Sequence, residues 1–87
     1  MKQRQIEREA KFENAGTCVS TVTREPVDLG WCNCKRVFLP YKGLDIDIVV
    51  VTTGPKKGAY VPEAVYRMYA QLHPNLLDAA LRKLHGR

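Results

Sequence analysis

Three cysteines are the first residues whose type and spacing could carry chemistry. Cys32 and Cys34 are separated by a single residue, and Cys18 lies upstream of both. Three thiolates and one of the two histidines could complete a tetrahedral zinc site. Strong structural zinc signatures, however, repeat a Cys-x-x-Cys or His-x-x-x-His spacing, which this chain lacks. We therefore expect no cofactor and interpret the thiols mainly as small core residues, with zinc as the weaker alternative.

Two carboxylates in an alternating segment form the second candidate site. In the segment LDIDI the residues Asp45 and Asp47 alternate with apolar residues, so that a strand would present both on one face. Such a pair can direct its oxygens at one magnesium ion. The longer string GLDIDIVVV, residues 43–51, resembles the acidic strand of nucleotidyltransferases related to polymerase beta. The resemblance implies a remnant metal-dependent nucleotidyltransferase in which both aspartates are metal ligands.

The chain departs from that family in two places. The Gly-Ser pair that the family carries upstream of the strand is absent, because Gly30 is followed by Trp31. No third acidic residue lies on a later strand, since Glu63 and Asp78 fall in predicted helices. We therefore interpret the aspartate pair mainly as the solvent-facing side of a strand.

Basic residues are concentrated in the last part of the chain. Residues 54–87 contain six Lys and Arg but only two Asp and Glu, and so hold most of the net charge of +5. Contact with phosphates requires charge and reach rather than an exact motif. We expect a nucleic-acid or other acidic partner to be bound by Lys56, Lys57, Arg82, Lys83 and Arg87.

The remaining candidate residues predict binding rather than catalysis. His73 and His85 have no nucleophile that the sequence places beside them, so we expect no enzyme activity. Trp31 and Tyr41 lie in predicted loops and are candidates for a protein interface. The leading hypothesis is thus a non-enzymatic module that contacts nucleic acid or a complex that handles it. The alternative is an inhibitor or accessory protein, of the type that phages and mobile elements encode, which binds a host protein complex.

The elements that must position these residues begin with an N-terminal segment. Lys2 to Asn14 contains neither Gly nor Pro, and Glu7 and Lys11 have the spacing of a helical ion pair. The sequence predicts an N-terminal helix or arm over residues 1–15, followed by a single α+β domain over residues 16–87.

Three strands are predicted next. The β-branched run Thr17 to Thr23 predicts a strand, and Pro26, Asp28 and Gly30 predict that Arg24 to Asn33 is a loop. Further strands are expected at Cys34 to Leu39 and at Leu44 to Thr53, with the latter in the centre of the sheet.

Two helices are predicted at the C-terminal end. Pro62 and Glu63 are suited to a helix start, and the His73-Pro74 pair separates this helix from a second one that begins near Asn75. The first helix carries an apolar stripe made of Val61, Val65, Met68, Tyr69 and Leu72. The expected fold is α+β: an N-terminal helix, a three-stranded, mostly antiparallel sheet and two C-terminal helices packed on one sheet face. This order of elements is similar to that of double-stranded-RNA-binding domains.

Length and composition limit the number of domains and the cellular compartment that we expect. With 87 residues the chain is expected to form one core. It has no apolar run long enough to span a membrane and no apolar signal-peptide core near Met1, so we expect a cytoplasmic protein without a membrane partner. The odd number of cysteines favours reduced thiols.

Overall fold

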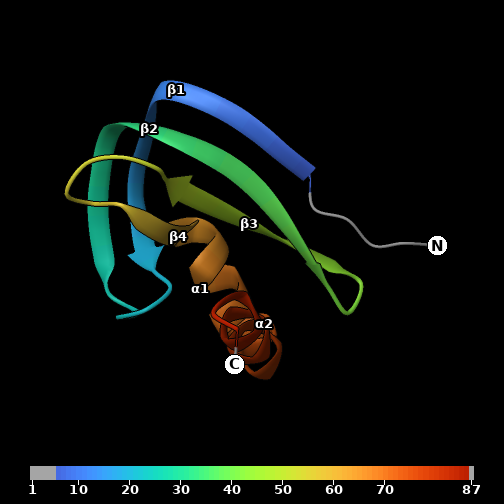
Figure 1. Cartoon of the computed structure of the whole chain (residues 1–87). Coiled ribbons are helices and arrows are strands. Elements are labelled where there is room, and N and C mark those ends of the chain that lie inside the picture. Colours follow the sequence, from blue (N-terminus) through green and yellow to red (C-terminus); the bar gives the residue numbers. More distant parts are fainter. Residues whose placement is uncertain (1–5, 87) are drawn as a thin grey trace.

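A four-stranded antiparallel barrel followed by two helices makes up the fold. The computed structural model describes residues 6–86, with side chains from residue 12 onward. The elements are β1 (Ile6–Ser20), β2 (Pro26–Tyr41), β3 (Leu44–Val51), β4 (Gly58–Pro62), α1 (Glu63–Leu72) and α2 (Pro74–Leu84). Each strand pairs with the next, and β1 also pairs with β4, which closes the barrel. Figure 1 shows the long β1–β2 hairpin curving around the barrel, with both helices on one side of the sheet.

The predicted N-terminal helix is wrong, because the segment that should form it belongs to β1. Residues 6–10 pair antiparallel with residues 34–38 of β2. Helix propensity is a weak prior that strand pairing overrides. Ile6, Ala10 and Phe12 occupy even positions, a spacing that fits a strand as well as the helix we expected. Residues 1–5 lie outside the described part of the chain.

The predicted loop from Arg24 to Asn33 is also wrong, since β2 begins at Pro26. Proline is tolerated at the first residue of a strand because it need not donate to the ladder there. Gly30 has a φ of 59° and lies where the β1–β2 register shifts, so that it forms a bulge rather than a turn. The turn residues of this segment therefore bend a strand without ending it.

The sheet has four strands rather than three. β4 follows the segment 52–57 and adds Gly58–Pro62 between β3 and β1. The strand predicted from Leu44 to Thr53 is present but ends at Val51, and in a closed barrel it is not central. The β2–β3 connection is the two-residue turn Lys42-Gly43, in which both residues have positive φ. The sequence missed β4 because its five residues precede Glu63 directly and resemble the lead into a helix.

Both predicted helices are present, but the apolar stripe of α1 is only partly buried. Tyr69 is buried, whereas Met68 and Leu72 are 46% and 66% exposed. Val61, which the sequence predicted as part of the stripe, is buried but belongs to β4. The face of α2 is buried as expected, at Leu77, Ala80 and Leu81. In the described residues no helix is both long and apolar enough to cross a membrane.

Two apolar clusters lie on opposite faces of the sheet, because alternate residues of a strand point to opposite sides. The helix-covered cluster contains Val37, Leu39, Ile46, Ile48, Val61, Tyr69, Leu77, Ala80 and Leu81. The inner cluster, enclosed by the barrel, contains Cys18, Leu29, Cys34, Val49, Val51 and Tyr60. The prediction that the β3 stretch Val49 to Val51 is covered on both sides agrees with this arrangement.

Candidate functional site

A cavity with exposed aromatic side chains lies where the segment 52–57 meets β1 and β2. It has a volume of about 360 Å³. The aromatic cavity, as we call it, is lined by Phe12, Leu29, Trp31, Cys32, Asn33, Val51, Thr53, Gly54, Pro55 and Lys56. It brings together Trp31 and Lys56, which the sequence predicted as members of two separate sites.

Trp31 and Phe12 owe their exposure to irregularities in the β1–β2 ladder. Trp31 is 72% exposed and follows the Gly30 bulge, while Phe12 is 68% exposed. Phe12 has a φ of 57°, a left-handed conformation that is strained for an aromatic residue, and lies at a second register shift. Bulges of this kind re-aim side chains, and here they leave two large aromatic rings in contact with water. Phe12 is not among the site residues that the sequence predicts, because its segment resembles a helix.

Lys56 is fixed beside this aromatic wall. Its Nζ atom donates a hydrogen bond to the carbonyl oxygen of Asp28, at 2.6 Å. The phenol of Tyr60 donates to the Lys56 carbonyl at 2.8 Å, and the Thr52 amide donates to the Asn33 carbonyl at 3.3 Å. The turn is therefore held against β2 at both of its ends, so that the charge of Lys56 is positioned at the aromatic cavity.

Asn33 adds an unusual polar group to the cavity wall. Among the described residues, its Oδ1 atom is the buried side-chain oxygen that lacks a hydrogen-bond partner. A buried acceptor without a donor costs free energy, and such atoms are rare in native proteins. Nothing in the sequence pattern indicated this residue.

The predicted basic residues do not form one surface. Lys56 and Lys57 lie in the turn before β4, whereas Arg82 and Lys83 are exposed in the last turn of α2. Arg82 lines a different cavity, together with residues of the β1–β2 turn. Arg87 lies outside the described residues. Tyr41, the second candidate for a protein interface, is half-buried against the helix-covered cluster, and the Lys42 ammonium lies 5.7 Å from the centre of its ring.

The three cysteines lie in and around the inner cluster. Cys18 and Cys34 are buried and Cys32 is half-buried, and all three are free thiols. Burial raises the pKa of Cys18 to about 11, and burial together with the neighbouring Cys32 raises the pKa of Cys34 to about 11. In the part of the chain that the structure describes, no group of His, Cys, Asp and Glu is placed to hold a metal ion. The geometry thus does not fit the zinc site that we weighed as an alternative.

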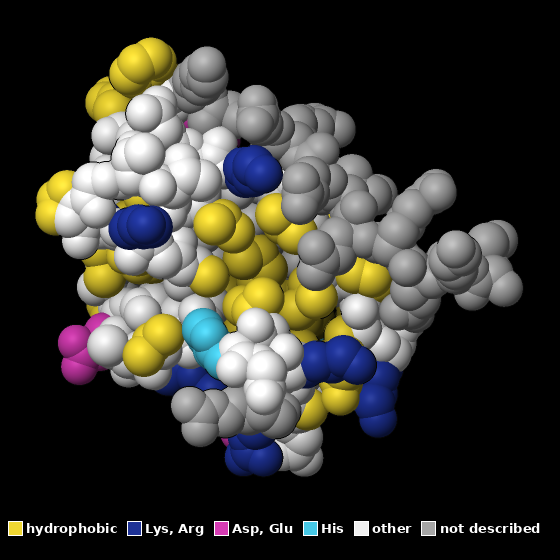
Figure 2. All heavy atoms as spheres, viewed as in Figure 1, with side chains coloured by type: hydrophobic (Ala, Val, Ile, Leu, Met, Phe, Trp, Pro, Cys, Tyr) yellow, Lys and Arg dark blue, Asp and Glu magenta, His cyan; other side chains and the backbone are white. Residues whose placement is uncertain are grey.

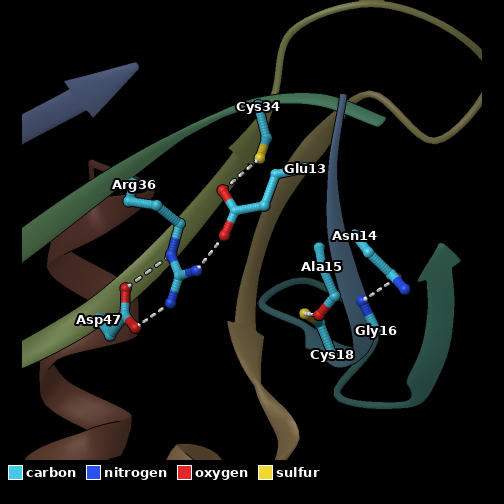
Figure 3. Close-up of polar contacts among 8 residues, drawn as sticks. All are labelled: Glu13, Asn14, Ala15, Gly16, Cys18, Cys34, Arg36 and Asp47. Atoms are coloured by element: carbon cyan, nitrogen blue, oxygen red, sulfur yellow. Dashed lines mark hydrogen bonds and ion pairs between the residues drawn. The ribbon is translucent and has the colours of Figure 1, made fainter. Parts of the chain in front are cut away.

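The predicted carboxylate pair is divided between two environments. Asp45 is exposed, but both carboxylate oxygens of Asp47 accept hydrogen bonds from the guanidinium group of Arg36. Arg36 also donates to Glu13 at 2.9 Å, and the Cys34 thiol lies 3.7 Å from the same carboxylate. Figure 3 shows Arg36 between the two acids. The arrangement satisfies charges on the inner face of the barrel and does not assemble two free aspartates for a metal.

Figure 2 shows one face of the molecule on which hydrophobic side chains line a hollow near the centre. Lys and Arg lie at several points around this hollow, and Asp and Glu appear near the edge of the face. A partner that meets this face encounters apolar area and positive charge together.

Comparisons of the chain with protein-family models, with curated proteins and with solved structures gave no match.

Proposed function

We propose that the chain is a non-enzymatic binding module for single-stranded nucleic acid, with the aromatic cavity and Lys57 as the contact surface. The observation that carries the proposal is the placement of two exposed aromatic rings and a fixed lysine around one cavity. Proteins that bind single strands combine aromatic platforms, on which bases stack, with cations that follow the backbone.

The charge of the chain supports the same kind of partner. A net charge of +5 attracts a polyanion, and the exposed Lys57 directly follows Lys56, which lines the cavity. Stacking tolerates any base because every base has a π-face, so we expect little sequence preference from Trp31 and Phe12.

The test is the anisotropy of a fluorescently labelled oligonucleotide titrated with the protein at several salt concentrations. Trp31→Ala is expected to weaken binding by about 1–3 kcal/mol, the usual value of one stacked base, and Trp31→Phe to retain most of the affinity. Lys56→Gln with Lys57→Gln is expected to reduce the salt slope by roughly 0.7 for each phosphate that the protein no longer neutralises.

A matched control is Lys42→Gln, because Lys42 is an exposed lysine in the turn at the opposite end of β3. It is expected to change neither the affinity nor the salt slope appreciably. Binding that ignores salt, or that survives Trp31→Ala unchanged, removes the proposal.

A second candidate is an accessory or inhibitory protein that binds a protein complex. The exposed Met68 and Leu72 on α1 favour it, because two large apolar side chains on one helix edge are suited to a protein partner. In that case Met68→Gln with Leu72→Gln should abolish a one-to-one complex purified from the native host, whereas Trp31→Ala should leave that complex intact.

A further inference from the structure

A second cavity lies between the β1–β2 turn and the C-terminal end of α2. It has a volume of about 370 Å³ and is lined by Thr21, Val22, Arg24, Leu81, Arg82 and His85. We refer to it as the turn cavity. Its residues come from two segments that lie far apart in the sequence. The Thr21 hydroxyl and the His85 ring, which form a hydrogen bond, belong to residues 64 positions apart.

Two guanidinium groups in this region share one carboxylate. Asp78 of α2 accepts a hydrogen bond from Arg24 at 2.9 Å, and its other oxygen lies 3.7 Å from Arg82. The Arg24 guanidinium holds the pKa of Asp78 below its usual value, so this acid is ionised at neutral pH. One negative charge thus faces two permanent positive charges, and each guanidinium has further N–H donors to offer.

The His85 ring is held in a defined orientation at the same place. The Thr21 hydroxyl donates its proton to the Ala59 carbonyl at 3.0 Å. Thr21 therefore accepts from the His85 Nε2–H group, at 2.9 Å, since it has no second proton to give. The second ring nitrogen, Nδ1, is the one that the contact with Thr21 does not occupy.

Arg24 occupies a backbone position that an arginine does not favour. Its φ is 65°, in the left-handed region where glycine or asparagine is the relaxed choice. The turn is closed by hydrogen bonds from the Arg24 amide to the Ser20 carbonyl at 2.9 Å and from the Ser20 amide to the Glu25 carbonyl at 3.0 Å. Cations in the last turn of α2 complement its dipole, which accounts for Arg82 and Lys83. The helix dipole does not explain why Arg24, which belongs to the β1–β2 turn, occupies a strained backbone position beside α2.

We propose that the turn cavity binds a phosphate group through Arg24, Arg82 and His85. Guanidinium groups match the geometry of phosphate oxygens, and the excess of positive charge is available without breaking the pair with Asp78. Val22 and Leu81 give the cavity apolar walls beside the two guanidinium groups. A phosphate attached to a small organic group therefore fits better than the bare ion. The site is separate from the aromatic cavity and does not depend on the function proposed for it.

The first experiment follows backbone and side-chain NMR signals while inorganic phosphate, and then phenyl phosphate, is added to the full chain. Shifts are expected at Thr21, Arg24 and His85, with tighter binding of phenyl phosphate. Arg24→Gly should lower the affinity about tenfold or more, the value of a hydrogen bond to a charged group. The same substitution relieves the left-handed strain, so a folded variant with unchanged thermal stability keeps the test valid.

Asp78→Asn provides a test in the opposite direction. It removes the carboxylate that competes with the anion, and should raise the affinity for phenyl phosphate by about two- to fivefold, the range of an exposed ion pair. The matched control is Arg67→Gln, because Arg67 also pairs with an acid, Glu63 at 3.1 Å, but on the exposed side of α1. It should leave binding unchanged.

A further titration identifies the source of the phosphate. A short oligonucleotide with a terminal phosphate, the same oligonucleotide without it, and phenyl phosphate are compared at equal salt concentration. Binding of either oligonucleotide at the turn cavity in Trp31→Ala indicates nucleic acid, and binding of phenyl phosphate alone indicates a small phosphate ester. Absence of shifts at Thr21, Arg24 and His85 with every probe, or unchanged affinity in both Arg24→Gly and Asp78→Asn, overturns the proposal.

Discussion

The two faces of the sheet are built from alternate residues of the same strands but are stabilised by different chemistry. On β3, Ile46 and Ile48 face the helices and belong to the helix-covered apolar cluster. Asp47 and Val49 face the interior of the barrel, where an arginine, two acids and free thiols lie beside an apolar cluster. The helix-covered face is stabilised by the burial of apolar side chains. The inner face is stabilised also by ion pairs among partly buried charged side chains.

The two faces should therefore respond differently to substitution. In an apolar face, loss of side-chain volume costs roughly 2–5 kcal/mol, and the introduction of an unpaired charge costs still more. A face that contains an ion network tolerates replacement of the whole network better than removal of one member.

Ile46→Asp should unfold the domain. Ile46 is fully buried between β3 and the helices, so the substitution places an unpaired carboxylate in an apolar cluster. Circular dichroism during heating should show no cooperative transition. The control is Asp45→Ala on the exposed neighbour, which should change the stability by less than about 0.5 kcal/mol. A cooperative melt of Ile46→Asp within a few degrees of wild type contradicts the prediction.

Arg36→Met should destabilise the protein by about 2–4 kcal/mol, because it leaves Asp47 and Glu13 as partly buried acids without a counter-charge. Urea denaturation measures the loss. The variant that also carries Glu13→Gln and Asp47→Asn should recover most of it, since no uncompensated charge remains. If the triple variant is less stable than Arg36→Met alone, uncompensated charge is not the cause of the destabilisation.

Stability should fall between about pH 9 and pH 11, and the inner face should be the reason. The thiols of Cys18 and Cys34 have a pKa of about 11 in the folded chain and 9.0 as ordinary thiols. Above pH 9 the unfolded thiols lose protons that the folded ones keep, so deprotonation favours unfolding, by roughly 1 kcal/mol per pH unit for each thiol. Urea denaturation across this range should show the fall, and Cys18→Ala with Cys34→Ala should flatten it. A stability that is constant or rises with pH in wild type contradicts the assignment.

Asn33→Val should have the smallest effect, between no change and a gain of about 1 kcal/mol. It removes the buried oxygen that lacks a partner and places a β-branched residue in a strand. Thermal denaturation of Asn33→Val and of the wild type measures this change in the free energy of unfolding. A loss of more than about 1 kcal/mol would mean that the Asn33 amide has a stabilising partner, such as a bound water molecule, in solution.

The sequence allowed the helix-covered face to be predicted, because its signals are local. The alternation of Leu44, Ile46 and Ile48 and the spacing of Leu77 and Leu81 lie within single elements. The inner face could not be predicted in the same way. Arg36 meets Glu13 across 23 positions and reaches Asp47 only because a tight turn at Lys42 sets the register.

The candidate site was only partly predictable for the same reason. Trp31 and Lys56 were identified by residue type, but their proximity depends on a bulge and on the hydrogen bonds that hold the 52–57 turn. Phe12 was placed in a helix because Glu7 and Lys11 have helical spacing, and pairing with β2 decided otherwise. Arg24 was assigned to a loop, and no local pattern indicates that it meets Asp78.

The most direct test of the proposed function uses the intrinsic fluorescence of Trp31, the only tryptophan in the chain. If bases stack on this exposed ring, a short single-stranded oligonucleotide should quench its emission in a saturable way, and added salt should reverse the quenching. The same titration with Lys56→Gln and Lys57→Gln should require more oligonucleotide. Emission that stays unchanged while the oligonucleotide is present in excess would contradict the central claim that the aromatic cavity binds single-stranded nucleic acid.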